Sequence, residues 1–301
     1  MDLNGDGNDD LISGSYWPGT IYVFWGKGGG KYSPVEPLKN AAGEKLHGGP
    51  PWKSKDAYER DSLASAPCAW DWDADGDLDM LIGNIGGRVI LIPNEGTAKA
   101  PSFDAAKRRV IEAAGAPIQV QGDSGPVVAD WDQDGEPDLL VGSADGSVTF
   151  YRNTGKRGAP VFAVGQVLVP KSKMGYQNAT PDGQIPETPG TRTKLCVIDW
   201  NGDGAVDLLM GDLWYGKPAE RKLTEEETAR LAELREKRKV LSEKSSKLHA
   251  ELKEKAKDDP QAKKTREELI EVSREVLKFE PRNTTHGSVW LYLRAKKPDS
   301  R

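Results

Sequence analysis

Closely spaced acidic side chains are the residues of this chain best suited to chemistry. Residues 130–139 follow the pattern D-x-D-x-D-G-x-x-D-L, with carboxylates at positions 1, 3, 5 and 9 and Gly135 at position 6. Carboxylates at this density repel one another unless a cation lies between them. The glycine permits a tight turn, and the carbonyl of position 7 supplies another oxygen. Calcium prefers such oxygen-only, multi-carboxylate coordination more than magnesium or zinc does.

The same loop occurs four times, starting at residues 2, 71, 130 and 199. Positions 1, 3, 5, 7 and 9 of each copy are the predicted calcium ligands, position 7 through its main-chain carbonyl. They are Asp2, Asn4, Asp6, Asn8 and Asp10; Asp71, Asp73, Asp75, Asp77 and Asp79; Asp130, Asp132, Asp134, Glu136 and Asp138; and Asp199, Asn201, Asp203, Ala205 and Asp207. Asparagine at position 3 removes one charge from the first and fourth loops, so we expect these two to bind calcium more weakly.

Short apolar runs on both sides of each loop predict strands rather than the helices of an EF-hand. In the third copy these runs are residues 126–129 and 139–141. A third apolar run and further turn signals follow, which gives four predicted strands per unit. The units span residues 1–38, 66–110 and 125–169, and the last starts at residue 194. The first unit lacks its first strand and the last has no clear fourth strand.

This combination resembles the FG-GAP/VCBS repeats of integrin-alpha-type β-propellers and of many secreted bacterial proteins. The resemblance covers residues 1–216 and 286–296. It implies an all-β fold, a partial β-propeller of about four blades, with Ca²⁺ as a structural cofactor. It also implies an adhesion, carbohydrate-binding or scaffolding role outside the cell. A fold alone does not imply an enzyme.

The segment 217–285 is different in kind, because it is rich in Glu, Lys, Arg, Leu and Ala. Thr224 with Glu227 predicts a capped helix that reaches about Lys257, and Asp259 with Pro260 starts a second helix. Narrow apolar stripes predict an antiparallel hairpin with coiled-coil packing, and the hairpin is a candidate for self-association. The expected domains are therefore the blades in 1–216, this insertion in 217–285, and a return strand with a tail in 286–301.

Composition excludes some classes of protein. The net charge is −5 and no basic patch with interleaved aromatics occurs, which argues against nucleic-acid binding. No apolar run approaches the length of a membrane span. Cys68 and Cys196 are expected to be small core residues of different sheets, with a disulfide possible only if those sheets approach each other. No signal peptide is visible and the chain begins inside a unit, so we expect a fragment of a longer extracellular or periplasmic protein.

Variable sequence gathers in the connections opposite the acidic loops, where we expect a protein or glycan ligand to bind. Trp17 and Trp214 are the candidate ligand-binding residues there. Trp72, Trp131 and Trp200 recur at one repeat position and are expected to pack inside the fold.

The favoured function is a calcium-stabilised binding or scaffolding module. The alternative is a carbohydrate-binding or polysaccharide-degrading propeller. No catalytic motif appears, and enzymatic activity stays open with binding favoured. A lyase could use His47, Tyr58, Arg60 or Tyr176.

Overall fold

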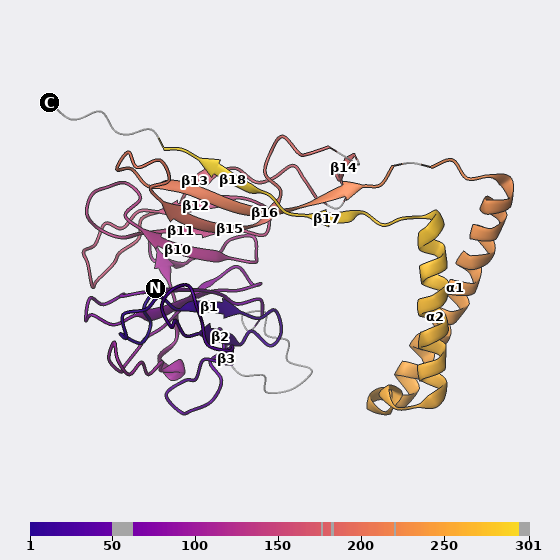
Figure 1. Cartoon of the computed structure of the whole chain (residues 1–301), viewed down its shortest axis with the longest axis horizontal. Helices are drawn as coiled ribbons and strands as arrows, with labels where there is room; N and C mark the ends of the chain where they lie inside the picture. The colour runs from indigo at the N-terminus through magenta and orange to yellow at the C-terminus, as the bar shows by residue number, and fades with distance from the viewer. Residues whose placement is uncertain (50–62, 176, 182–183, 220, 295–301) are drawn as a thin grey trace. The chain divides into compact units, whose positions relative to one another are not determined.

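The computed structural model describes residues 1–49, 63–175, 177–181, 184–219 and 221–294. The described residues form several antiparallel sheets and two long helices (Figure 1). They divide into two compact units. The first is Met1–Asn178, Pro186–Trp214 and His286–Arg301, and the second is Ala179–Ile185 and Tyr215–Thr285.

Four sheets follow one another along the first unit. The first sheet contains β1 (Leu11–Gly14), β2 (Ile21–Phe24) and β3 (Glu36–Pro37). The second contains β4 (Ala66–Trp70), β5 (Asp79–Gly83), β6 (Val89–Ile92) and β7 (Arg109–Val110). The third contains β10 (Gly125–Ala129), β11 (Asp138–Gly142), β12 (Val148–Tyr151) and β13 (Gln166–Val169). The fourth is built on β15 (Thr191–Ile198), β16 (Asp207–Lys217) and β18 (Val289–Tyr292).

Smaller elements complete the β structure. Strands β8 (Glu112–Ala113) and β9 (Ala116–Pro117) form a hairpin between the second and third sheets. Strand β14 (Thr180–Pro181) pairs in parallel with the end of β16, and β17 (Thr284–His286) also pairs with β16. A short 3-10 turn, η2 (Ala105–Lys107), precedes β7. Consecutive strands of the second and third sheets pair antiparallel.

Apolar clusters lie between successive sheets. The central strands β5 and β11 are buried along their whole length, because each has a neighbouring sheet on both faces. In β5, Met80 and Ile82 pack toward the first sheet, whereas Leu81 packs toward the third. A further cluster joins the third sheet to the fourth, with Leu140 and Met210 among its members. Side chains that alternate along one strand therefore belong to different cores.

A close backbone contact links each sheet to the next. A Cβ on Gly83 would lie 2.2 Å from the Ser124 carbonyl oxygen, and one on Gly142 would lie 2.5 Å from that of Thr193. The Ser124 hydroxyl donates to the carbonyl of Arg88 at 2.6 Å. Only glycine allows this approach, so Gly83 at the end of β5 and Gly142 at the end of β11 set the spacing to the next sheet.

The second unit contains the helical hairpin of α1 (Glu225–Leu252) and α2 (Pro260–Phe279), joined through η3 (Lys253–Lys257). Thr224 and Glu227 form the predicted reciprocal cap, and Asp259 caps α2 by accepting from the N–H of Ala262. The first helix ends at Leu252 rather than near Lys257, because the chain tightens there into a 3-10 turn. The interface is made by one stripe from each helix, namely Leu231, Leu234, Leu241, Val272 and Val276. Self-association through the hairpin stays a prediction.

The two cysteines are free thiols. Cys68 lies among the side chains that pack between the second and third sheets, and burial raises the pKa of its thiol. Cys196 is exposed, so the prediction that it is a core residue is wrong. It occupies the equivalent place in the fourth sheet, but on a face that no described sheet covers. No helix in the described part of the chain is both long and apolar enough to cross a membrane.

Candidate metal sites

The acidic loops occupy equivalent places in the sheets. The second, third and fourth loops connect β4 to β5, β10 to β11 and β15 to β16, and the first loop directly precedes β1. In every loop the glycine at position 6 has a positive φ with open space around it, as Gly76 (φ +96°) and Gly135 (φ +97°) illustrate. Backbone conformation, rather than crowding, therefore requires this glycine.

The aspartate at position 9 anchors each loop to the sheet. Its Oδ2 accepts the N–H of position 2 at 2.8–3.0 Å, and its Oδ1 accepts an N–H from two residues beyond the third strand at 2.7–2.8 Å. The four buried residues are Asp10, Asp79, Asp138 and Asp207. Burial raises the pKa of Asp79 and Asp138, although these backbone donors oppose that rise. The sequence predicted only a metal-binding role for position 9, and this structural role was missed.

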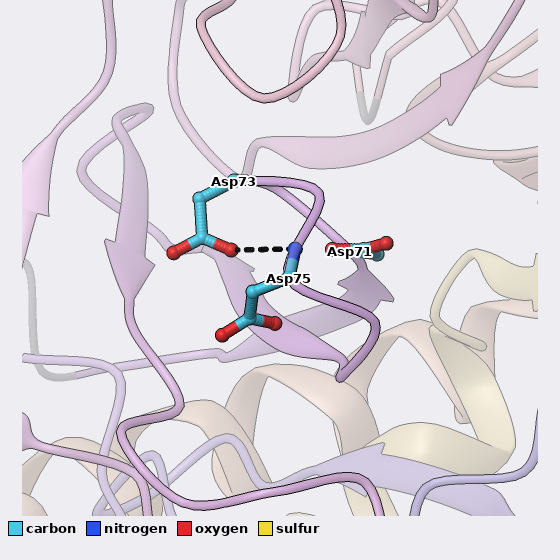
Figure 2. Close-up of side chains that lie close together, drawn as sticks. All are labelled: Asp71, Asp73 and Asp75. Atoms are coloured by element: carbon cyan, nitrogen blue, oxygen red, sulfur yellow. Dashed lines mark hydrogen bonds between the residues drawn. The ribbon is translucent and has the colours of Figure 1, made fainter.

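The second loop gathers three carboxylates at positions 1, 3 and 5. Asp71, Asp73 and Asp75 each place an oxygen within 4.8 Å of the others. Figure 2 shows these side chains around the turn, with the N–H of Asp75 donating to Asp73 Oδ1 at 3.3 Å. The guanidinium nitrogen of Arg157 lies 3.7 Å from Asp71 Oδ2, which is a long ion-pair contact. The loop therefore concentrates negative charge with little compensation.

Asp77, at position 7 of the second loop, adds to the negative charge of this loop. Its side chain is only 5% exposed, and its Oδ1 is buried without a hydrogen-bond partner. Burial, together with the charges of the neighbouring loop aspartates, raises the pKa of Asp77 to about 6. An unpartnered buried carboxylate is costly unless a cation or donor reaches it. The sequence had assigned position 7 a carbonyl role only, so the contribution of this side chain was missed.

The third loop has the same spacing but an internal counter-charge. Asp130, Asp132 and Asp138 place oxygens within 4.8 Å of one another. Arg152, just beyond β12, bridges two loop carboxylates, with Nε 2.7 Å from Asp132 Oδ2 and a terminal nitrogen 2.9 Å from Asp134 Oδ2. The N–H of Glu136 and this guanidinium lower the pKa of Asp134. The third loop is thus partly neutralised by the protein itself.

Asparagine at position 3 changes the first and fourth loops. The amide nitrogen of Asn4 lies 3.4 Å from Asp6 Oδ2, and that of Asn201 lies 3.1 Å from Asp203 Oδ2, so each amide donates to its neighbour. Neither of these loops, both fully described, forms a three-carboxylate cluster like those of the second and third. This agrees with their lower charge, while their weaker calcium affinity stays a prediction.

Comparison with known protein families identifies the repeats. The model of the FG-GAP-like repeat matches residues 2–50, 71–141 and 130–210, which together cover more than half of the chain. This chain belongs to the FG-GAP-like repeat family. Each of the three matches begins at the first aspartate of a loop, and the third extends through the fourth loop. No curated protein matches the chain.

The FG-GAP loops differ in how well their residues fit a bound cation. The second loop fits best, because it combines the three clustered carboxylates with the unpartnered oxygen of Asp77. The third loop also has a buried carboxylate oxygen without a partner, Glu136 Oε2, but Arg152 already holds two of its acids. All candidate metal-ligand atoms in both loops are oxygens, which suits a hard divalent cation such as calcium.

The two tryptophans predicted to bind ligand have different surroundings. The prediction that Trp214 is an exposed ligand platform is wrong. Strand β16 extends to Lys217, and the Trp214 side chain is only 8% exposed. Its ring stacks on His286 at 4.3 Å, and its indole N–H donates to the Ser288 hydroxyl. Trp17 lies in the β1–β2 connection and is 63% exposed, so its role in binding stays a prediction.

The structure adds little to the lyase alternative. His47 lies with Nδ1 3.3 Å from the Thr20 hydroxyl, and burial lowers its pKa. Tyr58, Arg60 and Tyr176 lie outside the described residues.

Proposed function

We propose that this chain is a calcium-stabilised FG-GAP array, part of a β-propeller, that acts as a binding or scaffolding module outside the cytoplasm. The sheets share one construction, pack face to face in chain order and keep the same glycine contact between neighbours. A propeller repeats such sheets around an axis. The second loop carries the proposal, because its clustered carboxylates and the buried Asp77 need a cation.

Calcium fits this need better than other metals do. The loop offers carboxylate and carbonyl oxygens without histidine or cysteine, and calcium accepts flexible geometries with six to eight oxygens. When bound, it would neutralise Asp71, Asp73, Asp75 and Asp77 and hold the β4–β5 turn closed. Extracellular calcium modules bind with Kd of about 10⁻⁴–10⁻³ M, so a loop of that affinity would fill with calcium outside the cytoplasm.

A regular scaffold with variable connections supports the binding role. Because strands alternate in direction, the acidic loops lie at one end of the sheets and the β1–β2 connection lies at the other. The irregular sequence falls in connections that are equivalent to the β1–β2 connection, and the insertion between β16 and β18 is one of them. Rigid sheets that carry variable loops are a common way to build a binding surface. The expected partner is a protein or a glycan.

Exposed aromatic side chains support ligand binding at the β1–β2 connection. Tyr16 and Trp17 are adjacent and exposed in the β1–β2 connection. Aromatic faces stack on the apolar faces of sugar rings and can also anchor a protein partner.

Thermal unfolding in excess EGTA and in millimolar calcium tests the metal part of the proposal, with magnesium as the control ion. Calcium should raise the Tm and magnesium should raise it much less. An identical Tm in EGTA and in calcium would rule out structural calcium.

A glycan array with a polysaccharide-cleavage assay tests the alternative. Glycan binding that is lost in Trp17→Ala would favour a carbohydrate-binding module, and turnover would favour an enzyme. Trp200→Ala is the matched control, since Trp200 is also exposed but follows the first aspartate of the fourth acidic loop. Equal loss in both variants would argue against a site at Trp17.

A further inference from the structure

One face of the fourth sheet exposes a row of apolar side chains. We define this outer face by residues from β15, the loop after it, β18 and the residue after β18, namely Cys196, Ile198, Trp200, Val289, Leu291 and Leu293. In the sheet register Leu209 pairs with Cys196 on one side and with Leu291 on the other. The apolar residues therefore lie beside one another across the strands and form one continuous patch.

The same positions are buried in the preceding sheets. Val289 pairs with Gly211 of β16, as Val89 pairs with Gly83 of β5 and Val148 with Gly142 of β11. Val89 and Val148 are both 0% exposed, whereas Val289 is 72% exposed. Leu91 and Leu291 are likewise equivalent, with 1% and 41% exposure. In the second and third sheets the next sheet covers these positions.

The recurring tryptophan is likewise covered in the second and third sheets and exposed in the fourth. Trp72 packs near Phe162 of the third sheet, with ring centroids 5.9 Å apart. Trp131 lies under the guanidinium of Arg294, which follows β18 of the fourth sheet, at 4.9 Å. Trp200 has the same place in its own sheet and is 59% exposed. The expectation that all three pack inside the fold is therefore wrong for Trp200, because no described sheet follows the fourth.

The first sheet exposes the opposite half of such an interface. Leu11 and Phe24 pair in its register as Met80 and Ile92 pair in the second sheet. Met80 and Ile92 are fully buried against the first sheet, but Leu11 is exposed and Phe24 is half-buried. We call this the free face of the first sheet, with Leu11, Ser13, Tyr22 and Phe24 as its members. It contains no charged side chain at these positions.

We propose that the outer face of the fourth sheet docks onto the free face of the first sheet in a second copy of this chain. The contact continues the interface that already joins neighbouring sheets within the chain. The residues of both faces stand at the repeat positions that pack against each other between neighbouring sheets of the chain. Both faces are apolar, so docking removes hydrophobic surface from water. The contact is head to tail, and it either closes a ring or extends into a longer array.

Sedimentation velocity of the full chain from low to high micromolar concentration tests the proposal. The wild type should form dimers or larger species as its concentration rises. Leu291→Glu and Leu11→Glu each place a charge on one face and should remove this association. Val164→Glu is the control, since Val164 is exposed outside both faces and should associate as the wild type does. Circular dichroism and a thermal melt check that the variants fold, which their exposed positions favour.

An equimolar mixture of Leu291→Glu and Leu11→Glu identifies the orientation. Each variant keeps one intact face, so the mixture should form a single heterodimer and no larger species. A wild type that stays monomeric at every concentration would overturn the proposal. Self-association of Leu11→Glu alone, at wild-type strength, would also overturn it, because two outer faces would then pair with each other. Association lost on deletion of 222–281, but kept in Leu291→Glu, would assign the contact to the hairpin and reject the proposal.

Discussion

The second and third acidic loops have the same spacing of carboxylates but balance their charge in different ways. In the second loop, Asp77 adds a carboxylate whose buried Oδ1 has no hydrogen-bond partner, and the guanidinium of Arg157 lies 3.7 Å from Asp71. In the third loop, Arg152 contacts two of the acids at 2.7 and 2.9 Å. The comparison teaches that two copies of one FG-GAP motif can differ in how far the protein itself neutralises their carboxylates.

The largest expected effect is the loss of calcium stabilisation from the second loop. Asp73→Asn with Asp75→Asn should remove more of the calcium-induced rise in Tm than Asp132→Asn with Asp134→Asn. Calcium at a hundredfold excess over its Kd stabilises one site by about 2.7 kcal/mol, which corresponds to roughly 5–10 °C in a domain of this size. Differential scanning calorimetry in calcium and in EGTA measures it. Equal losses in the two double variants would contradict the ranking.

Asp77→Asn should have opposite effects with and without calcium. In EGTA it removes an unpartnered buried charge and should stabilise the protein by about 1–3 kcal/mol. In calcium it removes an oxygen charge from the site and should weaken binding by isothermal titration calorimetry. Glu136→Gln, at position 7 of the third loop, is the matched control and should change both quantities less, since this side chain is only half-buried. Destabilisation by Asp77→Asn in EGTA would contradict the assigned role of Asp77.

Removal of Arg152 should make the third loop more like the second in its calcium binding. Arg152→Gln frees Asp132 and Asp134 and should raise the calcium affinity of the third loop about two- to fivefold, because exposed ion pairs are worth about 0.2–1 kcal/mol. It should also lower the Tm in EGTA slightly. Arg157→Gln is the control, with a smaller effect expected from its longer contact to Asp71. Unchanged affinity in Arg152→Gln would show that the guanidinium does not compete with the ion.

A pH dependence of stability is also expected without calcium. The pKa of Asp77 in the folded protein is about 6, above the ordinary value of 3.8, so the folded state binds more protons between these values. The free energy of unfolding should therefore fall as the pH rises from about 4 to about 6 through this group. Urea unfolding across this range measures it, and the slope should be shallower in Asp77→Asn. Identical slopes in the two proteins would contradict the raised pKa.

Local sequence predicted the parts of the fold that depend on neighbours in the chain. The acidic turns, the strands around them, the FG-GAP-like repeats and the caps at Thr224 and Asp259 all follow from residue types at short spacing. The bounds of the second and third units coincide with the first and last strands of their sheets. Antiparallel sheets with two helices could be predicted because turn, strand and helix preferences agreed in each segment.

Contacts between distant residues could not be predicted in this way. Arg152 reaches Asp132 and Asp134 only because β12 ends beside the third loop. Trp214 was predicted to lie exposed in a loop. It is buried because β16 continues through this position to Lys217. Cys196 is exposed, although its equivalent Cys68 packs between two sheets. In each case the neighbour that decides the environment comes from another strand or another sheet.

The sequence by itself determined where the acidic turns lie, which strands flank them and that the unit repeats, because these depend on backbone preference and on side-chain spacing over a few residues. Only the tertiary structure decided which loop has a close counter-charge and which sheet faces stay exposed among the described residues. Charge balance and burial depend on groups brought together from far along the chain, since electrostatic and hydrophobic interactions act through space. Repeats that look equivalent along the sequence are therefore physically distinct in the folded protein.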